Sequence, residues 1–556
     1  MKPFFITTAI DYTNGAPHIG HAYEKVLADV LARFKRQTGC EVFLLTGVDQ
    51  HGQKVQQSAE KAGISPQEYV EGVTAKFRAL WEKLGVRYDG WAATTDTLHK
   101  ECVRANLQLL WDDKVPGTDR SRWIYRKTQR GFYSVRQEQF LTDKERGPDG
   151  EFGPEWQPVE EREEENFYFR LTAHPDLGFD PKQWLLDFID RRSKEEKPFV
   201  VPEFRVAELR NAVEKLEGDL CISRPAARLQ WGIPFPESFG EGFVTYVWFD
   251  ALVNYISFAP GHDTHHGVKG AVTTTSGLGF PDYWPPVHVI GKDILIPAHG
   301  VYWPVMLKAL GFADEEMPTL LVHGWWNIRG KGGESEKMSK SLGNVVDPDV
   351  LADKYGPAAL RYYLMSDIAT GRDADFSEER LVQRYNVDLA NGLGNLVNRT
   401  LNMTRKYREG APKSIIGGHL RLPNDLREHL VVNADAFEWA QNYYAISEPK
   451  GAMEKMVDVV NRANALVDSA APWKLAKDPE QADRLDAVLT TLILSARTAA
   501  TMLLPVLPEA ATEILRQLNL PLRKGLVQDQ ALPDGYCCGE PKPVFPRIEL
   551  LAPESN

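Results

Sequence analysis

Apolar residues follow two different periods in the first fifty residues of the chain. Residues 4–8 and 42–46 are short apolar runs of strand length, whereas residues 20–37 repeat their apolar positions at close to the helical period. Residues 11–17 contain an Asn-Gly pair and a proline, so they predict a loop between the first strand and the helix. A strand, a helix and a second strand in this order predict a parallel strand pair in an α/β sheet.

The same pattern returns near residue 290. Residues 287–290 and 320–322 predict strands, and residues 294–310 between them predict a helix. The residues between the two units, 116–230, are rich in charged, aromatic and turn-forming types, which indicates a module inserted into the sheet domain. We interpret the acidic run at 160–165 as a solvated surface.

Helical periodicity dominates from residue 381 onward. Amphipathic stretches at 381–407, 433–447 and 451–469 succeed one another, and the breaks between helices fall at Pro412, Pro449, Pro472 and Pro479. The apolar tract 487–508 carries Arg497, several threonines and two prolines, so it is a poor membrane span and an ordinary buried bundle helix. The expected fold class is α/β, with a Rossmann-like parallel-sheet domain split by an inserted module and followed by an α-helical bundle.

Composition narrows the class of protein. With 556 residues, of which 43% are hydrophobic and 26% charged, the chain is expected to form a globular protein of several domains. A net charge of -12 argues against a chain coated in nucleic acid but is compatible with a local basic face. Five scattered cysteines without a CxxC motif fit reduced thiols, and the first residues lack the character of a signal or transit peptide. We therefore expect a cytoplasmic protein without a membrane segment.

Two histidines stand at the start of the first predicted helix, in the string His18-Ile19-Gly20-His21. The chain has no Walker A loop and no complete GxGxxG, so other groups would have to hold a nucleotide. This turn is expected at the carboxyl edge of the sheet, where the positive helix N-terminus attracts anions. Imidazoles at i and i+3 share one helix face, and Gly20 leaves space beside the backbone. Alone, the string is equally compatible with two histidines that merely cap a helix.

A second motif, Lys337-Met338-Ser339-Lys340-Ser341, follows a glycine-rich stretch at residues 330–333. Two lysines on a mobile loop suit a phosphate chain, whose charge has to be met most strongly while bonds break. A KxxK string alone is usually a solvated pair of charges. An HIGH string after the first strand together with a KMSKS string beyond the last one is the signature of class I aminoacyl-tRNA synthetases, which this chain resembles.

The resemblance implies a reaction and the residues that carry it. An amino-acid carboxylate would attack the α-phosphorus of ATP, pyrophosphate would leave, and the aminoacyl group would pass to the terminal ribose of tRNA. By resemblance, the catalytic residues that stabilise the phosphates are His18, His21, Lys337 and Lys340. ATP, brought with Mg²⁺, would also contact Gly20, Gly291, Asp293, Met338 and Ser339. Little covalent chemistry falls to the protein, so positioning and electrostatics would supply the rate.

Local strings resemble the methionyl family of these enzymes: residues 9–15 (AIDYTNG), 48–52 (VDQHG), 246–252 (YVWFDAL) and 290–293 (IGKD). The spacing from His18 to Lys337 leaves little room for the editing insertion of the isoleucyl, valyl and leucyl enzymes. By resemblance, Asp49 takes the α-ammonium group of methionine. The side-chain site would comprise Ala9, Ile10, Tyr12, Trp248, Ala251, Leu252, Tyr255 and His299. Tyr12 and His299 are candidates for weak hydrogen bonds to the thioether sulfur.

The inserted module departs from the family pattern. Many members carry Cys-knuckle zinc sites there, but residues 131–137 (GFYSVRQ) have no cysteine at either knuckle position. We therefore expect the module to fold without zinc, and we expect no metal ligand among the side chains of the chain.

The helical bundle resembles an anticodon-binding domain. Residues 394–399 (GNLVNR) match the family's anticodon-reading helix, in which Asn395 and Arg399 at i and i+4 face the same way. Trp473 matches a tryptophan on which an anticodon base stacks. A basic stripe without acids is expected along the same segment: Arg399, Arg405, Lys406 and Arg408.

These resemblances assign the domains and partners. The two halves of the catalytic domain are expected at 1–115 and 231–325, the connective module at 116–230, the KMSKS loop and stem-contact region at 326–380, and the anticodon-binding domain at 381–556. The expected partners are L-methionine and tRNA(Met). A monomer is expected because no appended tRNA-binding or dimerisation domain is seen.

Three other functions stay open at this point. A valyl or leucyl synthetase without editing would share both motifs. A non-catalytic tRNA-binding paralogue usually erodes one active-site motif, whereas both are intact here. A small-molecule nucleotidyltransferase can share the HIGH turn but lacks a long helical C-terminal bundle.

Overall fold

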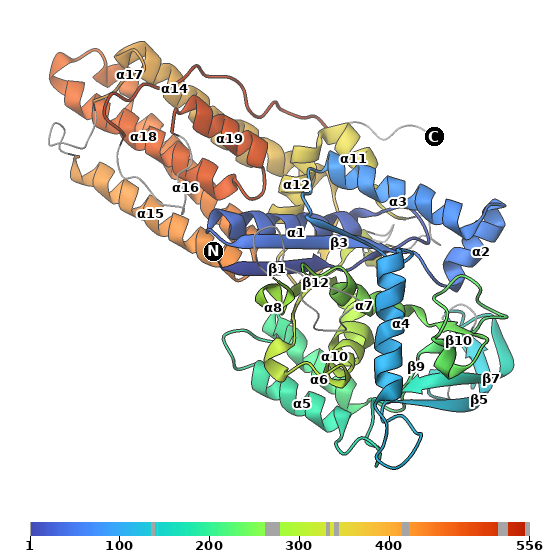
Figure 1. The fold of residues 1–556 in the computed structure, drawn as a ribbon. Helices are drawn as coiled ribbons and strands as arrows, with labels where there is room; N and C mark the ends of the chain where they lie inside the picture. Colours follow the sequence, from blue (N-terminus) through green and yellow to red (C-terminus); the bar gives the residue numbers. More distant parts are fainter. Residues whose placement is uncertain are drawn as a thin grey trace.

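A parallel sheet forms the middle of the molecule, with a helical bundle on one side and a smaller module of strands and helices on the other (Figure 1). The computed structural model describes residues 2–134, 139–141, 143–261, 279–329, 334–338, 344–413, 422–520 and 532–550. Across these ranges, no helix is both long and apolar enough to cross a membrane.

Seven strands of the described chain form the central sheet, and their pairings are parallel. Their order is β2 (Asp11–Tyr12), β3 (Glu41–Asp49), β1 (Pro3–Thr8), β12 (Val287–Gly291), β13 (Thr319–His323) and β8 (Val200–Val201), with β4 (Gly90–Ala93) paired to β3. The two strand–helix units predicted from the sequence therefore meet in one sheet, where β1 pairs with β12. The predicted α/β fold class with a parallel sheet and a helical C-terminal region is confirmed.

The chain changes direction across the sheet at β1. It runs outward from β1 to β3 on one side and returns on the other side at β12 and β13. Helix α1 (Ile19–Gln37) follows β1 and is buried without a break from Ala22 to Ala32, mostly through apolar residues but also through the charged residues Glu24, Lys25 and Asp29. In a parallel sheet of this kind, a crevice opens at the carboxyl ends of the strands where the order reverses. The ends of β1 and β12 are thus the place to look for a ligand site.

The helix predicted at 294–310 is interrupted. It consists of α9 (Lys292–Ile294), the π-helical segment η5 (Leu295–Tyr302) and α10 (Trp303–Ala309). Ile296 has extended dihedral angles (φ -116°, ψ 126°), because the residue before a proline is driven out of the helical region. The sequence analysis missed the break although Pro297 signals it.

The module between the two sheet halves is built on a long antiparallel pair, β5 (Ile124–Ser134) and β7 (Val159–Phe169). β6 (Gln139–Phe140), β9 (Leu220–Cys221) and the helices α5 (Pro181–Arg192) and α6 (Val206–Glu214) accompany this pair. The acidic run at 160–165 lies on β7, where Glu163 is opposite Arg130 of β5 and Glu165 pairs with Arg126 at 2.5 Å. The acidic run is therefore part of a partly solvated strand, which the sequence pattern did not predict because the run is so highly charged. The strand β8 between α5 and α6 pairs with β13, so this module also adds an edge to the central sheet.

Further helices and short strands complete the sheet side of the molecule. They are α2 (Gln53–Ala62), α3 (Pro66–Lys83), α4 (Thr97–Asp112), β10 (Ser223–Pro225), β11 (Phe243–Thr245), α7 (Val247–Ser257), α8 (Phe280–Tyr283), β14 (Trp326–Arg329), β15 (Ser335–Lys337), β16 (Ala374–Asp375), α11 (Pro348–Tyr355) and α12 (Pro357–Ser366). Helix α12 packs against both α1 and the bundle. There, buried Arg361 donates to Asp29 of α1, to the carbonyl of Leu84 and to the carbonyl of Val506.

The regular secondary structure in the described part of the bundle is helical, as the sequence predicts, and residues 532–550 follow it without a helix or strand. It contains α13 (Glu378–Arg384), the π-helical segment η8 (Tyr385–Gly394), α14 (Asn395–Arg408), α15 (Asn424–Ala445), α16 (Pro449–Ala470), α17 (Pro472–Leu475), α18 (Ala482–Leu503) and α19 (Pro508–Gln517). The apolar tract from residue 487 belongs to α18, which is buried on all sides from Leu485 to Ala500. Its interpretation as a bundle helix is confirmed.

Candidate active site

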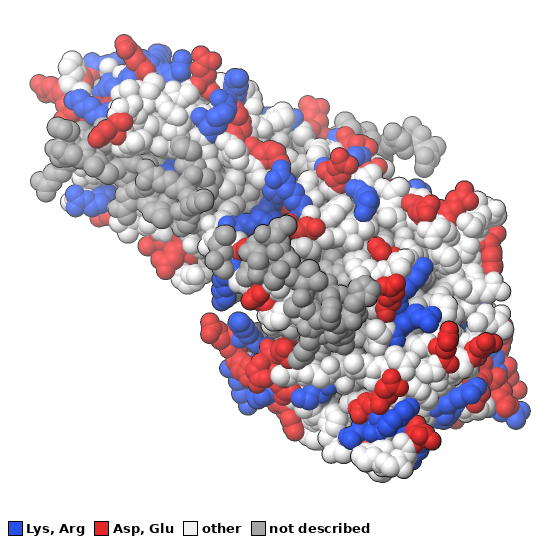
Figure 2. All heavy atoms as spheres, viewed as in Figure 1, with Lys and Arg blue, Asp and Glu red and all other residues white. Residues whose placement is uncertain are grey.

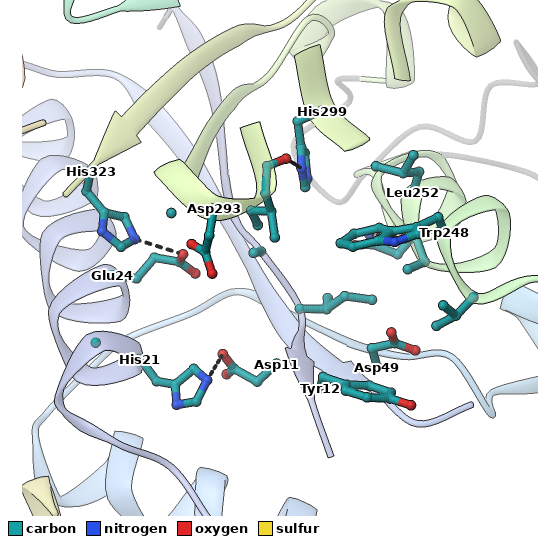
Figure 3. A pocket seen from close by; sticks show the side chains of 18 of the residues that line it. Asp11, Tyr12, His21, Glu24, Asp49, Trp248, Leu252, Asp293, His299 and His323 are labelled. Atoms are coloured by element: carbon teal, nitrogen blue, oxygen red, sulfur yellow. Dashed lines mark hydrogen bonds and ion pairs between the residues drawn. The ribbon is translucent and has the colours of Figure 1, made fainter. Parts of the chain in front are cut away.

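A cavity of about 640 Å³ opens at the carboxyl ends of the central strands. Ala9 and Ile10 follow β1, Asp49 ends β3, Gly291 ends β12 and His323 ends β13, and all five residues line it. Figure 3 looks into this cavity, with His21 and Glu24 of α1 on one side and Trp248 and Leu252 of α7 on the other.

His18 and His21 hold the start of α1 together. His18 is the N-cap residue, and its Nδ1 accepts a hydrogen bond from the Gly20 amide at 3.1 Å. The Nδ1 of His21 accepts one from the His18 amide at 3.1 Å, which completes a capping box. The two rings stack with centroids 3.7 Å apart. A Cβ at position 20 would lie 3.0 Å from Cε1 of His18, so this folded-back ring explains the glycine.

These contacts fix the tautomer of both rings. Because Nδ1 of each histidine accepts a backbone hydrogen bond, the proton of the neutral ring resides on Nε2. Nε2 of His21 points towards Asp11, at 4.0 Å from Oδ1 (Figure 3). The helix start thus presents two N–H donors at the end of a helix dipole that favours anions.

The opposite wall of the cavity is one face of α7. Trp248, Ala251, Leu252 and Tyr255 all line the cavity, and their spacing of i, i+3, i+4 and i+7 places them on a single stripe of the helix. With Ala9, Ile10 and Tyr12 they form a largely apolar, aromatic enclosure. Such walls suit an unbranched apolar side chain.

A buried hydrogen-bond network fixes α7 from behind. Asp250 is fully buried and accepts from His51 Nδ1 and from His99 Nε2, each at 2.7 Å. Burial raises the pKa of Asp250, but the two histidines outweigh it and lower the pKa to about 2. The ionised carboxylate of Asp250 therefore ties α7 to His51, which follows the end of β3, and to His99 of α4. These two bonds hold the apolar wall in place relative to β3.

Tyr255 and His299 form a hydrogen-bonded pair at the inner end of the cavity. Tyr255 Oη lies 2.8 Å from His299 Nε2, and His299 Nδ1 lies 3.0 Å from the carbonyl of Ile294. Burial lowers the pKa of His299 to about 4, so the ring is neutral at physiological pH. A carbonyl can only accept, so Nδ1 carries the proton and Nε2 accepts from the Tyr255 hydroxyl. The interrupted helix at Ile296 is what exposes the Ile294 carbonyl to this histidine.

Asp49 lies at the mouth of the apolar enclosure and is 6% exposed. Its Oδ1 lies 3.4 Å from the Thr94 hydroxyl. Its own carbonyl accepts from the Thr13 amide and hydroxyl, which fixes the loop after β2 to the end of β3. The backbone of Gly52, with φ 111°, lies close to the Tyr12 hydroxyl. Only glycine fits there, because a Cβ at this position would lie 2.7 Å from the Tyr12 Oη.

The half of the cavity that the sequence predicts for the nucleotide, called the nucleotide half below, comprises Gly291, Asp293, His323 and the tryptophans after β13. Asp293 accepts from Trp325 Nε1 at 3.3 Å, and Glu24 lies 3.0 Å from His323 Nε2. Strand β15 pairs antiparallel with β14, so the backbone of Lys337 lies beside Asn327 and Met338 reaches the cavity. The Lys337 side chain, Ser339 and Lys340 lie outside the described residues.

Comparison with known proteins settles the family. A family model described as "tRNA synthetases class I (M)" matches residues 4–149 and 155–401. Methionine–tRNA ligase of Lactococcus lactis is 36% identical over 99% of this chain and 78% of the relative. The Deinococcus radiodurans ligase is 38% identical over 93% of this chain and 70% of the relative. The chain belongs to the methionyl-tRNA synthetase family.

Solved structures of the methionyl-tRNA synthetase family agree. The Mycobacterium tuberculosis methionyl-tRNA synthetase in complex with methionyl-adenylate superposes with a TM-score of 0.84 at 34% identity, over 98% of this chain and 100% of that one. The apo form of the same enzyme superposes with a TM-score of 0.79 at 30% identity, over 99% of each chain.

The residues predicted from the sequence converge on the one cavity. Every residue predicted for methionine lines it: Ala9, Ile10, Tyr12, Asp49, Trp248, Ala251, Leu252, Tyr255 and His299. Of those predicted for ATP, the cavity is lined by His18, Gly20, His21, Gly291, Asp293 and Met338.

Sequence analysis missed several lining residues. Among them are Asp11, Glu24 and His323. Glu24 lies one turn after His21 on the same helix face, and His323 ends a parallel strand. Both positions follow from the rules that located the neighbouring residues. Asp11 carried no such signal, because a charged residue in a loop is usually solvated.

The residues predicted to read the anticodon lie in the bundle, outside the cavity. Asn395 begins α14 and is exposed, and Arg399 follows one turn later and pairs with Asp468 of α16 at 2.8 Å. Trp473 in α17 is 39% exposed, and α17 lies at the end of the bundle remote from the sheet (Figure 1).

The predicted basic stripe without acids along α14 is wrong. Arg408 pairs with buried Asp486 of α18, Arg405 lies 3.7 Å from Glu540, and Arg399 pairs with Asp468. The acids come from segments distant in sequence, which a local pattern does not reveal. Figure 2 likewise shows basic and acidic side chains interspersed over the face in view.

Proposed function

We propose that this chain is a methionine–tRNA ligase, which activates L-methionine with ATP to methionyl-adenylate and pyrophosphate and then transfers methionine to the 3′ end of tRNA(Met). The observation that carries the proposal is the continuity of the cavity. Its apolar wall on α7 and its two-histidine helix start face one space. A carboxylate substrate held at one end therefore lies beside the phosphates held at the other.

The first step forms one bond and breaks one. A carboxylate oxygen of methionine attacks the α-phosphorus of ATP, and the bond from that phosphorus to the oxygen bridging it to the β-phosphate breaks. Pyrophosphate leaves with the electron pair. The protein supplies orientation and charge stabilisation, because the nucleophile is already ionised.

The motif residues are proposed to stabilise the phosphates in this step. His18 and His21 would donate from Nε2, the proton position that their capping contacts enforce. Lys337 and Lys340 would neutralise the charge that develops on the leaving pyrophosphate. Gly20, Gly291, Asp293, Met338 and Ser339 are proposed to contact the remainder of ATP. Mg²⁺ is proposed to enter with ATP, since phosphate oxygens are the hard ligands that it prefers.

Methionine is proposed to bind with its ammonium group on Asp49 and its side chain against α7. His299 has no N–H to give to the thioether sulfur, because Nδ1 donates to Ile294 and Nε2 accepts from Tyr255. We therefore withdraw His299 as a sulfur donor. It acts by orienting Tyr255, and polarizable contacts with the aromatic walls recognise the sulfur.

In the second step, a hydroxyl of the terminal ribose of tRNA attacks the carbonyl carbon of the adenylate, and AMP leaves. Asn395, Arg399 and Trp473 are proposed to read the anticodon, with Trp473 as a stacking surface. We also propose a cytoplasmic monomer. A sedimentation mass of twice the 62.7 kDa chain mass would contradict the monomer.

ATP–pyrophosphate exchange with single amino acids tests the proposal. Methionine should support exchange at least about a hundredfold better than valine or leucine, since the cavity presents aromatic walls that suit a polarizable thioether. Equal or better exchange with valine or leucine would assign the chain to another synthetase. No exchange with any amino acid would indicate a non-catalytic tRNA-binding protein.

A further inference from the structure

Lys25 is a fully buried cation beneath the floor of the cavity. Its side chain is 0% exposed, and its Nζ lies 2.5 Å from Asp11 Oδ1, 2.9 Å from Glu24 Oε1 and 2.9 Å from the Ala9 carbonyl. A buried ammonium group is costly unless oxygens replace its hydration shell. Three oxygens do so here, and all three belong to residues that line the cavity.

The two carboxylates that Lys25 contacts face the nucleotide half of the cavity. Asp11 is next to His21, at 4.0 Å, and Glu24 is next to His323, at 3.0 Å (Figure 3). Among the described residues that line the cavity, four carry a carboxylate, because Asp49 and Asp293 join Asp11 and Glu24, and one lysine, Lys54, lines it as well. Such a wall would repel a triphosphate strongly, since charges a few ångströms apart inside a protein are poorly screened.

Each of the other two carboxylates has a partner of its own, in the proposed complex or in the structure. Asp49 faces the methionine ammonium, and Asp293 accepts from Trp325 Nε1. Asp11 and Glu24 are instead matched from below by the single charge of Lys25 and by His323. We propose that Lys25 is a further positioning residue of the adenylate-forming site, which balances the charge of Asp11 and Glu24 and so keeps the nucleotide half of the cavity receptive to ATP. This inference rests on the proposed function.

The ionisation of the cluster agrees with a close balance. Burial raises the pKa of Asp11 to about 7 although Lys25 lowers it. Burial also raises the pKa of Glu24, but Lys25 and the contact with His323 outweigh it, so this pKa is lowered. The two carboxylates raise the pKa of Lys25 against the effect of burial. Loss of the ammonium would remove the charge that lowers the pKa of Asp11 and of Glu24, so whichever carboxylate stays ionised at the floor of the cavity would be uncompensated.

A merely structural ion pair would behave differently from a positioning residue. Loss of a structural pair lowers stability and affects both substrates alike. Loss of the charge balance should weaken ATP selectively, and removal of one carboxylate should restore ATP binding. The test therefore needs a double variant as well as a single one.

The experiment measures the KM values for ATP and methionine in ATP–pyrophosphate exchange. Lys25→Met should raise the KM for ATP about tenfold or more, while the KM for methionine changes less than about threefold. The double variant Asp11→Asn/Lys25→Met should return the KM for ATP to within about threefold of the unmodified chain. Lys35→Met is the matched control, because Lys35 lies on the same helix but over the Phe4 ring, and it should change neither value.

An unchanged KM for ATP in Lys25→Met overturns the inference, and so does a double variant no better than the single one. Should Lys25→Met fail to fold, Asp11→Asn decides, since it keeps Lys25 and removes one carboxylate. A KM for ATP equal to or below that of the unmodified chain supports the inference, and a rise beyond about threefold overturns it.

The unmodified chain is measured first. If it shows no methionine-dependent exchange, the proposed function fails and this inference falls with it. If it exchanges and Lys25→Met behaves like it, only the inference fails.

Discussion

Each histidine of the first motif uses one ring nitrogen for the helix and the other for the cavity. His21 Nδ1 accepts from the His18 amide, so the Nε2 proton is the one available to an anion. The same side chain therefore starts the helix and, in the proposed function, contributes to the chemistry. These two roles can be separated by substitution, because different nitrogens serve them.

His21→Asn should keep the cap and lose the donor, since an asparagine side chain reaches the position of Nδ1 but not that of Nε2. Adenylate formation should slow about a hundredfold to a thousandfold, as for loss of one transition-state donor. His21→Ala should lose the cap as well and cost about 1 kcal/mol more in the free energy of unfolding. Single-turnover exchange and thermal unfolding measure the two effects. Full activity of His21→Asn would remove His21 from the mechanism.

His299 predicts a pH dependence of stability. Its pKa falls from 6.5 to about 4 on burial, so below pH 6.5 the unfolded chain binds a proton that the folded chain does not. Stability due to this group is complete above about pH 6.5 and is lost as the pH falls towards 4. Between pH 6.5 and 5, the loss of unfolding free energy should be about 2 kcal/mol.

His299→Gln should remove this part of the acid sensitivity, since an amide can still accept from Tyr255 and does not titrate. Denaturant unfolding of both proteins at the two pH values measures the difference. His288, whose pKa is lowered well below its ordinary value by burial and by the neighbouring His299, is present in both proteins. Equal acid sensitivity of the two proteins would show that His299 is not held neutral by burial.

At the scale of single residues, sequence resemblance located the residues predicted for methionine at the cavity, but it missed lining residues such as Glu24 and His323 and the interactions among the side chains. The string AIDYTNG located Tyr12 at the cavity, yet the pairing of Asp11 with Lys25 depends on how the loop after β1 lies against α1. Contacts between side chains so far apart in sequence follow from packing, which neither period nor motif spacing reports.

Among the elements, periodicity predicted the strands and helices that are buried on one face. It failed where charge or proline interrupts the pattern, as in β7 with its acidic run and in η5 at Pro297. β8 was missed because two residues give no period. Its pairing with β13 depends on the whole inserted module folding against the sheet edge.

The inserted module is expected to contain no zinc. β5 and β7 pair over their whole length, and Tyr133 near the end of β5 is buried between Arg162 and Arg228, which donates to its hydroxyl at 2.6 Å. These contacts of Tyr133 stabilise the end of β5 without a metal, whereas a Cys-knuckle would depend on zinc. Elemental analysis of the purified protein should find well below one zinc per chain, and one equivalent that resists chelation would contradict this account.

A substitution at the tip of the bundle should lower tRNA charging and leave ATP–pyrophosphate exchange unchanged. Trp473→Ala should lower the kcat/KM for tRNA charging about tenfold or more, because base stacking on an aromatic ring is worth about 1–3 kcal/mol. ATP–pyrophosphate exchange should stay unchanged. Trp439→Ala is the matched control, since Trp439 is also an exposed bundle tryptophan, at 57%, on α15. Equal loss of charging in both variants, or a loss of exchange in Trp473→Ala, would count against the anticodon assignment.

For the whole molecule, the sequence predicted the order of the parts better than their junctions. The halves of the sheet, the module between them and the bundle follow the predicted order along the chain. The limits of the domains stay predictions, because the parts interlock: β8 joins the sheet, and Arg361 bonds to Asp29, Leu84 and Val506 at once. A junction of this kind depends on a single polar residue such as Arg361, and a single residue produces no periodic pattern in the sequence.

Because the cavity and the tip of the bundle lie far apart, the proposed charging of tRNA depends on both ends of the molecule. In the proposed function, exchange would need only the cavity, whereas charging would need the acceptor end in the cavity while the bundle holds the anticodon. A protein that performs exchange alone would satisfy the site description and still fall short of the proposed function.

The most direct measurement is therefore aminoacylation of a tRNA(Met) transcript by the unmodified chain, compared with the same transcript carrying an altered anticodon. The account predicts that methionine becomes attached to the first transcript, with a kcat/KM at least about a hundredfold higher than for the second. Equal charging of both transcripts, or exchange with methionine but no charging of tRNA(Met), would contradict it.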